Sequence, residues 1–178
     1  MIIVIAGTPG SGKTTVAEML AKRQGMNIIS SGLIFREEAL RRGLTLAEFG
    51  ALAQKNHKID MDLDRRVTEM ILERYRSEDI VVDSRLQAFF LKRENVKFFA
   101  AYVDAPLKAR AERIAKREVK SVEQVTLEIE EREKSEKSRY QTIYKVDISD
   151  KSIYDVIVDS GDKSPDQVVD LIWSQVPR

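Results

Sequence analysis

The sequence has 178 residues, and its 30 basic and 29 acidic side chains leave a net charge of +1 at neutral pH. This length suits one compact domain, and the balanced charge argues against a nucleic-acid partner. The absence of cysteine excludes disulfides and thiolate metal sites, and no apolar stretch resembles a signal peptide or a membrane span. We therefore expect a cytoplasmic monomer that has no membrane partner.

Short apolar segments that are typical of buried strands alternate along the chain with segments of helical spacing. The expected strands cover residues 1–6, 27–30, 80–83, 97–104 and 154–159. The expected helices cover residues 13–24, 33–42, 45–55, 61–76, 106–117, 121–144 and 164–175. Because strands that are apolar throughout are usually covered on both faces, the pattern predicts an α/β fold. Its centre is an open, parallel five-stranded sheet with helices on both faces.

The first strand and the first helix flank a glycine-rich segment, GTPGSGKT, that fits the phosphate-binding pattern G-x-x-x-x-G-K-[ST] at every fixed position. We expect Lys13 to reach the β- and γ-phosphates of a nucleotide and the Thr14 hydroxyl to hold Mg²⁺. The residues expected to bind the nucleotide are Gly7, Thr8, Pro9, Gly10, Ser11, Gly12, Lys13, Thr14 and Thr15. The alternative, a chance glycine turn with an exposed lysine, does not explain the strand and helix on either side.

Two helical insertions interrupt the alternation of strand and helix, one before the third strand and one between the fourth and fifth strands. Since α/β sheets bind ligands at the carboxyl edge of their strands, we expect both insertions to lie above that edge. The insertion at residues 31–76 would bind an acceptor, and the insertion at residues 117–139 would form a lid. The core of the single domain would then comprise residues 1–30, 77–117 and 140–178.

Two charged residues follow the third expected strand. Asp83 stands where Mg²⁺ and its water ligands need a carboxylate, and Arg85 stands where a guanidinium can bind a phosphate with two nitrogens. The alternatives are a helix cap for Asp83 and a solvated loop position for Arg85.

The second insertion and the helix before it carry arginines at helical spacing. One face of helix 106–117 holds Arg110, Arg113 and Arg117, and one face of helix 121–144 holds Arg132, Glu136 and Arg139. We expect Arg113, Arg117 and Arg132 to clamp the phosphoryl group during its transfer. The alternative is a solvated helix with ion pairs at i,i+4 spacing, because several glutamates lie nearby.

Several stretches of the chain resemble the nucleoside monophosphate kinases, and among them the short archaeal-type cytidylate kinases. In chain order these are GTPGSGKTT, SSGLIFRE, the segment Asp83-Ser84-Arg85, VDAPLKARAERIAKRE, REKSEKSRYQTIY and DISDKSIYDVIVDS. They cover nearly the whole chain. The resemblance implies that ATP, with Mg²⁺, donates its γ-phosphoryl group to CMP or dCMP.

The resemblance also implies roles for single residues. Arg36 and Arg85 would bind the acceptor phosphate, and Ser31 would contact the base or sugar. Arg132 and Arg139 would reach the acceptor phosphate and the transferred group, and Glu136 would accept a hydrogen bond from the cytosine amine. The chain departs from the longer bacterial-type enzymes, which carry aspartate in place of Glu136 and an arginine-aspartate pair in place of Arg85-Leu86.

Two alternative functions remain open at this point. One is a kinase of another small acceptor, such as AMP, UMP or a phosphorylated metabolite. The other is a nucleotide-dependent switch, which needs a guanine-reading N/T-K-x-D segment that this chain lacks. The single histidine, His57, is expected in a solvated loop.

Overall fold

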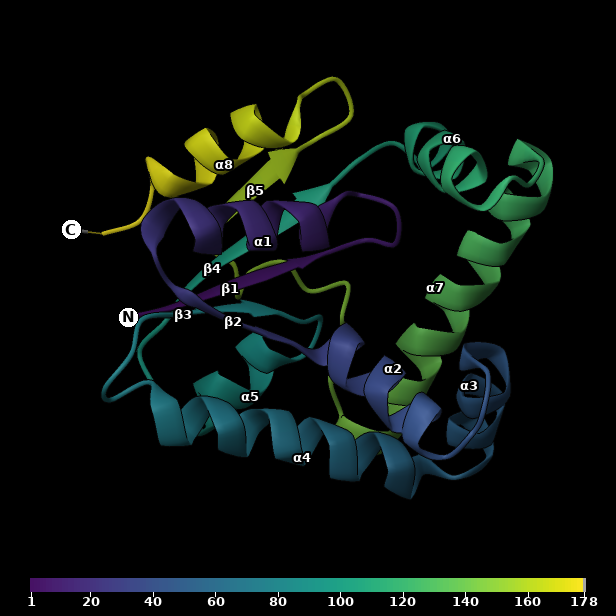
Figure 1. The fold of residues 1–178 in the computed structure, drawn as a ribbon, viewed down its shortest axis with the longest axis horizontal. Coiled ribbons are helices and arrows are strands. Elements are labelled where there is room, and N and C mark those ends of the chain that lie inside the picture. Colours follow the sequence, from purple (N-terminus) through teal and green to yellow (C-terminus); the bar gives the residue numbers. More distant parts are fainter. Residues whose placement is uncertain (178) are drawn as a thin grey trace.

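The computed structural model describes residues 1–177, without the side chains of Leu46 and Ala47. Its five parallel strands form one sheet in the order β2-β3-β1-β4-β5 (Figure 1). The strands are β1 (Ile2–Gly7), β2 (Asn27–Ser30), β3 (Ile80–Asp83), β4 (Phe99–Asp104) and β5 (Val156–Asp159). Ser30 and Ile5 lie opposite Asp83 in the neighbouring strands, so the carboxyl ends of β1, β2 and β3 meet at one edge.

Eight helices are formed within the described residues. They are α1 (Lys13–Gln24), α2 (Ser31–Arg41), α3 (Leu46–Lys55), α4 (His57–Arg74), α5 (Gln87–Arg93), α6 (Leu107–Glu118), α7 (Val122–Tyr144) and α8 (Pro165–Trp173). Helices α1 and α8 cover one face of the sheet, and α4 and α5 cover the other (Figure 1). No helix in residues 1–177 is both long and apolar enough to cross a membrane.

The sheet is apolar on both faces because alternate residues of one strand point to opposite sides. Ile3 and Ile5 pack with α1 and α8, whereas Ile2 and Val4 pack with α4 and α5. All four side chains are almost fully buried. This arrangement confirms the predicted open parallel sheet with helices on both faces.

The helical insertions have small apolar clusters of their own. Phe49 is fully buried among residues of α2, α3 and α4, and Val125 and Ile129 of α7 pack against the alanines of α6. Helix α7, which forms most of the second insertion, then runs from α6 back toward α2, α4 and α5 (Figure 1).

Several element bounds differ from the sequence prediction by a few residues, and one helix was not predicted. Helix α4 begins at His57, not at residue 61, because the Asn56 side chain accepts a hydrogen bond from the Lys58 N–H and caps the helix. His57 is exposed, but it is a helical residue and not part of a loop. The pattern also gave no separate helix after Arg85, where the structure forms the short helix α5.

Candidate active site

The phosphate loop connects β1 to α1, and a side chain at Gly7 or Gly10 would clash with the backbone of neighbouring elements. Gly10 has a φ of 81°, and a Cβ added there would lie 2.9 Å from the Arg110 carbonyl oxygen. A Cβ added to Gly7 would lie 2.1 Å from the Val103 carbonyl oxygen. The loop therefore follows a path against β4 and α6 that only glycine permits at these positions.

Three side chains outside the motif hold the loop in place through hydrogen bonds. The Thr8 hydroxyl donates to Asp104 Oδ1 at 2.9 Å, and the Arg110 guanidinium donates to the Pro9 carbonyl at 3.2 Å. Ser160, at the end of β5, donates its hydroxyl to the Ser11 carbonyl at 2.8 Å. The sequence pattern gave no role to Asp104 or Ser160. The one feature of the sequence that could have indicated these roles is that both residues follow apolar runs that end at the same sheet edge.

A buried carboxylate lies beside the loop, as the sequence predicted. Asp83 is 2 % exposed, and it accepts hydrogen bonds from Lys13 Nζ at 2.9 Å, Thr14 Oγ1 at 2.9 Å and Ser30 Oγ at 3.0 Å. Burial lowers the pKa of the Lys13 ammonium, and the charge of Asp83 acts in the opposite direction. The cluster thus holds the lysine in place before any nucleotide arrives.

The same cluster fits a magnesium ion. A hydroxyl and a carboxylate are hard oxygen ligands, and Mg²⁺ is usually held by one or two carboxylates together with substrate phosphates and water. Thr14 and Asp83 supply such a pair. Within residues 1–177 there is no cluster of three or more histidine, cysteine or acidic side chains that would form an all-protein metal cage.

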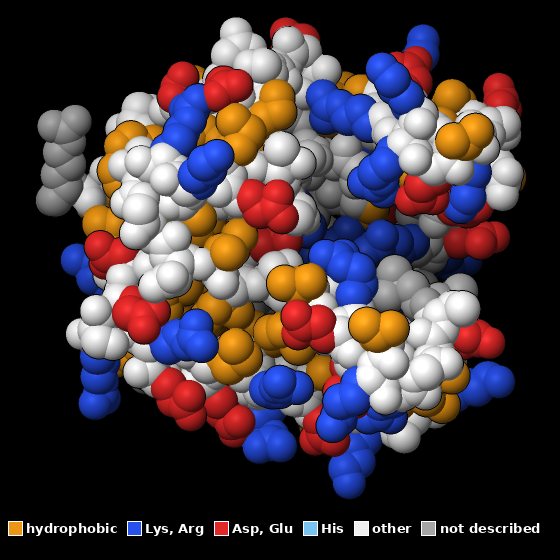
Figure 2. Space-filling view, in the orientation of Figure 1, with side chains coloured by type: hydrophobic (Ala, Val, Ile, Leu, Met, Phe, Trp, Pro, Cys, Tyr) orange, Lys and Arg blue, Asp and Glu red, His pale blue; other side chains and the backbone are white. Residues whose placement is uncertain are grey.

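A cavity of about 490 Å³ extends along the phosphate loop and brings most of the predicted residues together. Beside the loop itself, its lining includes Gly32, Arg36, Asp83, Arg85, Arg113, Arg117, Arg132 and Lys163. Figure 2 shows basic side chains gathered in the hollow between the sheet and the arm formed by α6 and α7. Ser31, Glu136 and Arg139 are not part of this lining. The cavity therefore has an excess of cationic side chains, a composition that suits phosphate groups.

Glu136 of α7 lies behind these arginines and pairs with two of them. Its Oε1 accepts from Arg132 Nε at 2.8 Å, and its Oε2 pairs with the Arg85 guanidinium. Glu136 is buried, and burial together with nearby Arg132 lowers the pKa of Arg85 to about 10. Arg132 and Glu136, two members of the predicted face, thus contact each other, but both carboxylate oxygens of Glu136 already have arginine partners.

Arg139 does not line the cavity beside the phosphate loop, although the resemblance implied a role for it at the acceptor phosphate. Its Nε is 3.1 Å from Asp60 Oδ2 in a largely buried ion pair that joins α7 to α4. One turn along each helix, the Tyr144 hydroxyl donates to Asp64 Oδ2 at 2.5 Å. The i,i+4 spacing of Asp60 and Asp64 on one face of α4 was the available signal for this contact.

Asp64 titrates in the neutral range. Burial raises the pKa of its carboxyl to about 7, the hydrogen bond from Tyr144 opposes this shift, and the nearby charge of Asp60 adds to it. Burial also raises the pKa of Asp60, and Arg139 acts against that change. Arg139 and Tyr144 therefore do not fully offset the cost of burying the charge of the two carboxylates between α4 and α7.

The three arginines of α6 do not act alike. Arg110 is buried and donates to the Ala105 and Pro9 carbonyls and to Glu133 Oε1. Arg113 donates to the carbonyls of Ser11, Ser160 and Gly161, which ties the segment after β5 to the phosphate loop. Only Arg117 is exposed, where it pairs with Glu118 at the rim of the cavity.

A phosphate loop, a buried carboxylate at the end of β3 and arginines above the same edge define a P-loop NTPase-type protein with the architecture of small-molecule kinases. Shikimate kinase from Bacteroides thetaiotaomicron shares this fold, with a TM-score of 0.63 and 13 % identity over 98 % of this chain and 97 % of that one.

Sequence comparison then gives the family. The chain belongs to the cytidylate kinase-like family, whose model matches residues 2–162. It is 46 % identical to the cytidylate kinase of Natronomonas pharaonis and 44 % identical to that of Halorubrum lacusprofundi. Each alignment covers 99 % of this chain and 89 % of the relative. The resemblance to the archaeal-type cytidylate kinases is therefore confirmed.

Proposed function

We propose that this protein transfers the γ-phosphoryl group of ATP to CMP, and to dCMP, releasing ADP and the nucleoside diphosphate. The observation that carries the proposal is that the phosphate loop faces two arginines, Arg85 and Arg132, which share the buried carboxylate of Glu136. One set of cations thus serves a donor triphosphate, and a second set serves an acceptor phosphate.

On the donor side, the N–H groups of residues 8–14 and the start of α1 would surround the β- and γ-phosphates. Lys13 would move from Asp83 to these phosphates, because an ammonium is drawn to the greater negative charge. Thr14 and Asp83 would hold Mg²⁺, which neutralises phosphate charge when it is bound.

On the acceptor side, Arg36, Arg85 and Arg132 would bind the phosphate of CMP. Arg36 lines the cavity and has no hydrogen bond or ion pair to another residue in the described part of the chain, so its guanidinium is available. Glu136 would then accept from the cytosine amine, Ser31 would contact the base or sugar, and Arg139 would complete the phosphate site. The last role requires Arg139 to leave Asp60.

During transfer, Lys13, Arg117 and Arg132 would contact the moving group and stabilise its charge. Arg113 would contribute by holding the loop that they surround, since its donors are directed to backbone carbonyls. Closure of α6 and α7 over the cavity would exclude water and prevent ATP hydrolysis. We also propose that the protein works as a monomer in the cytoplasm, where its nucleotide substrates occur.

A coupled assay for ADP tests the proposal with CMP, dCMP, UMP, AMP and GMP as acceptors. We expect ADP only when an acceptor is present, with CMP and dCMP giving the highest kcat/KM. A higher kcat/KM for UMP or AMP would replace the proposed acceptor, and slow ADP formation without any acceptor would indicate a nucleotide switch.

A further inference from the structure

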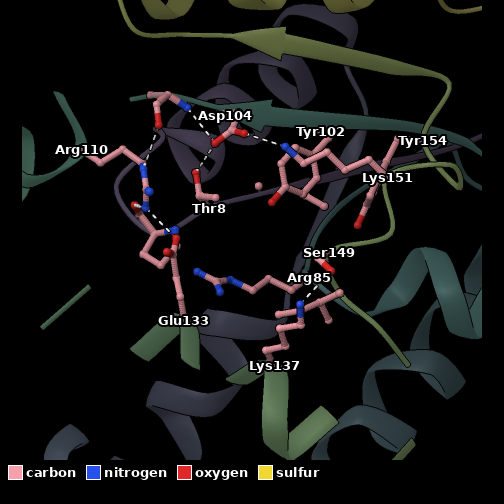
Figure 3. Close-up of a pocket in the computed structure, with 15 residues that line it drawn as sticks. Thr8, Arg85, Tyr102, Asp104, Arg110, Glu133, Lys137, Ser149, Lys151 and Tyr154 are labelled. Carbon is pink, nitrogen blue, oxygen red and sulfur yellow. Dashed lines mark hydrogen bonds and ion pairs between the residues drawn. The ribbon is translucent and has the colours of Figure 1, made fainter. Parts of the chain in front are cut away.

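A second cavity, of about 400 Å³, lies beside the first half of the phosphate loop and is called the back cavity below (Figure 3). Its walls come from the ends of β1 and β4, the middle of α7 and the segment at residues 148–154. It shares Thr8, Pro9 and Arg85 with the phosphate cavity, and its other lining residues are different. The proposed kinase reaction gives this back cavity no role.

The back cavity has an excess of positive charge. Four cationic side chains line it, Arg85, Arg110, Lys137 and Lys151, against two carboxylates, Asp104 and Glu133. Arg110 is neutralised by Glu133 at 2.7 Å, and Lys151 is neutralised by Asp104 at 2.7 Å. Arg85 and Lys137 have no carboxylate partner within the lining, although Arg85 pairs with Glu136 outside it and Asp147 lies 3.9 Å from Lys137.

Arg85 and Lys137 each have N–H groups that donate to no residue in the described part of the chain. Lys137 Nζ contacts the Ser149 hydroxyl at 3.1 Å and lies 3.9 Å from an Asp147 oxygen, and its side chain is 58 % exposed. Arg85 extends across the cavity in Figure 3, and it uses one guanidinium nitrogen for Glu136. An anion in the cavity would therefore meet two cationic groups from different elements.

Two tyrosine hydroxyls complete the set of donors. Tyr102 and Tyr154 are each 9 % exposed, and their rings lie 4.9 Å apart. Both hydroxyls are directed toward the cavity in Figure 3, and neither has a hydrogen-bond partner among residues 1–177. Neither hydroxyl oxygen is fully buried, so both can donate to a ligand with acceptor oxygens that enters the cavity.

We propose that the back cavity binds a small phosphorylated metabolite, whose phosphate is held by Arg85, Lys137 and the two tyrosine hydroxyls. A phosphate ester offers several strong acceptor oxygens and a double negative charge, which match these donors. The volume lies in the range of small-molecule sites and leaves room for an organic group beyond the phosphate.

Such a ligand would act on the phosphate cavity through shared contacts. Arg85 lines both cavities, so an anion behind the loop competes with Glu136 and with an acceptor phosphate for the same guanidinium. Asp104, in the wall of the back cavity, also accepts the Thr8 hydroxyl of the loop. Binding at the back is therefore coupled to binding at the front.

Backbone amide NMR with inorganic phosphate as the probe tests this site independently of catalysis. With ADP saturating the phosphate loop, we expect saturable shifts at residues 148–154. They should persist in Arg36→Ala, because Arg36 lines only the phosphate cavity. Shifts confined to residues 8–15 and 31–36 would overturn the proposal.

Two variants and a matched control locate the bound phosphate. We expect Lys137→Ala and Tyr154→Phe to weaken the response at residues 148–154 at least tenfold. Lys134→Ala removes the same charge from an exposed position on α7 that is outside the cavity, and it should leave the response unchanged. Equal weakening in Lys137→Ala and Lys134→Ala would show general charge attraction only and would reject the site. Thermal unfolding of each variant checks that the fold is retained.

Discussion

Lys13 is the residue on which the proposed chemistry depends most directly. Its ammonium lies 2.9 Å from Asp83 beside the phosphate loop, and it is not part of an apolar core. We expect Lys13→Ala to lower kcat/KM about 10²-fold or more, because such electrostatic contacts contribute several kcal/mol to the barrier. Lys22→Ala, at an exposed position on the same helix, is the control and should keep full activity. Near-normal turnover in Lys13→Ala would contradict the proposed kinase activity.

Glu136 is the residue on which the proposed selection of the base depends. Glu136→Gln removes the charge and exchanges one acceptor oxygen for a donor, which suits the carbonyl of UMP better than the amine of CMP. A mismatched buried polar pair costs about 1–3 kcal/mol, so we expect the CMP-to-UMP ratio of kcat/KM to fall about ten- to a hundredfold. The exposed Glu131→Gln on the same helix is the control. An unchanged ratio would mean that Glu136 serves the arginines alone.

Asp64 gives stability a pH dependence of unusual sign. Its pKa is raised from 3.8 to about 7 on folding, so the folded state binds more protons than the unfolded state between these values. Its contribution to the free energy of unfolding is full below pH 3.8 and is lost as the pH rises through 7. Asp64→Asn can still accept from Tyr144 but does not titrate. Denaturant unfolding at pH 4 to 8 should show wild type losing stability relative to Asp64→Asn, and parallel profiles would contradict this.

At the scale of elements, Arg110 joins α6 to the phosphate loop and to α7. Its guanidinium satisfies two backbone carbonyls and Glu133 in a largely buried position. We expect Arg110→Ala to destabilise the fold by about 2–4 kcal/mol, because it leaves buried acceptors unpaired. The KM for ATP should also rise, because the Pro9 carbonyl in the phosphate loop loses its hydrogen bond from Arg110. Lys108→Ala, exposed on the same helix, should change neither value. Calorimetry and initial rates measure both effects.

Elements whose bounds are set by neighbouring residues in the sequence could be predicted best. Strands β2 and β3 and helix α1 begin and end as the apolar pattern indicated, because flanking glycines and polar residues define them. Helix α5 was not predicted as a separate element, because seven residues are too few for a clear period. The start of α4 depends on the Asn56 side chain, which the helical pattern alone does not show.

The site followed the same rule. The phosphate loop, Asp83 and the arginine face were predictable because each is a short motif or a single helical face. The pairing of Arg139 with Asp60 was not, since it joins helices that are distant in sequence. Nor could spacing distinguish Arg113, directed to backbone carbonyls, from Arg117 at the rim, although both were expected to clamp phosphate.

For the whole molecule, we propose that the two insertions move relative to the sheet. The first insertion has a small apolar cluster that meets a sheet core only through Leu63, and the second packs on α6 in a cluster of its own. We expect a CMP–ATP bisubstrate analogue to slow amide hydrogen exchange at residues 33–60 and 117–137, with little change in β1, β3 and β4. Equal protection of both insertions with and without the analogue would contradict the division into core, acceptor insertion and lid.

The bridge from Glu136 to Arg85 and Arg132 means that the protein carries its own anion where we propose that the acceptor phosphate binds. An arriving phosphate would displace a carboxylate instead of dissolved salt ions. The affinity for the acceptor should therefore vary less with ionic strength than it would if Arg36, Arg85 and Arg132 were all unpaired. The same exchange would reject cytidine, because a nucleoside without phosphate has no charge to offer the arginines, and Glu136 would stay paired with them.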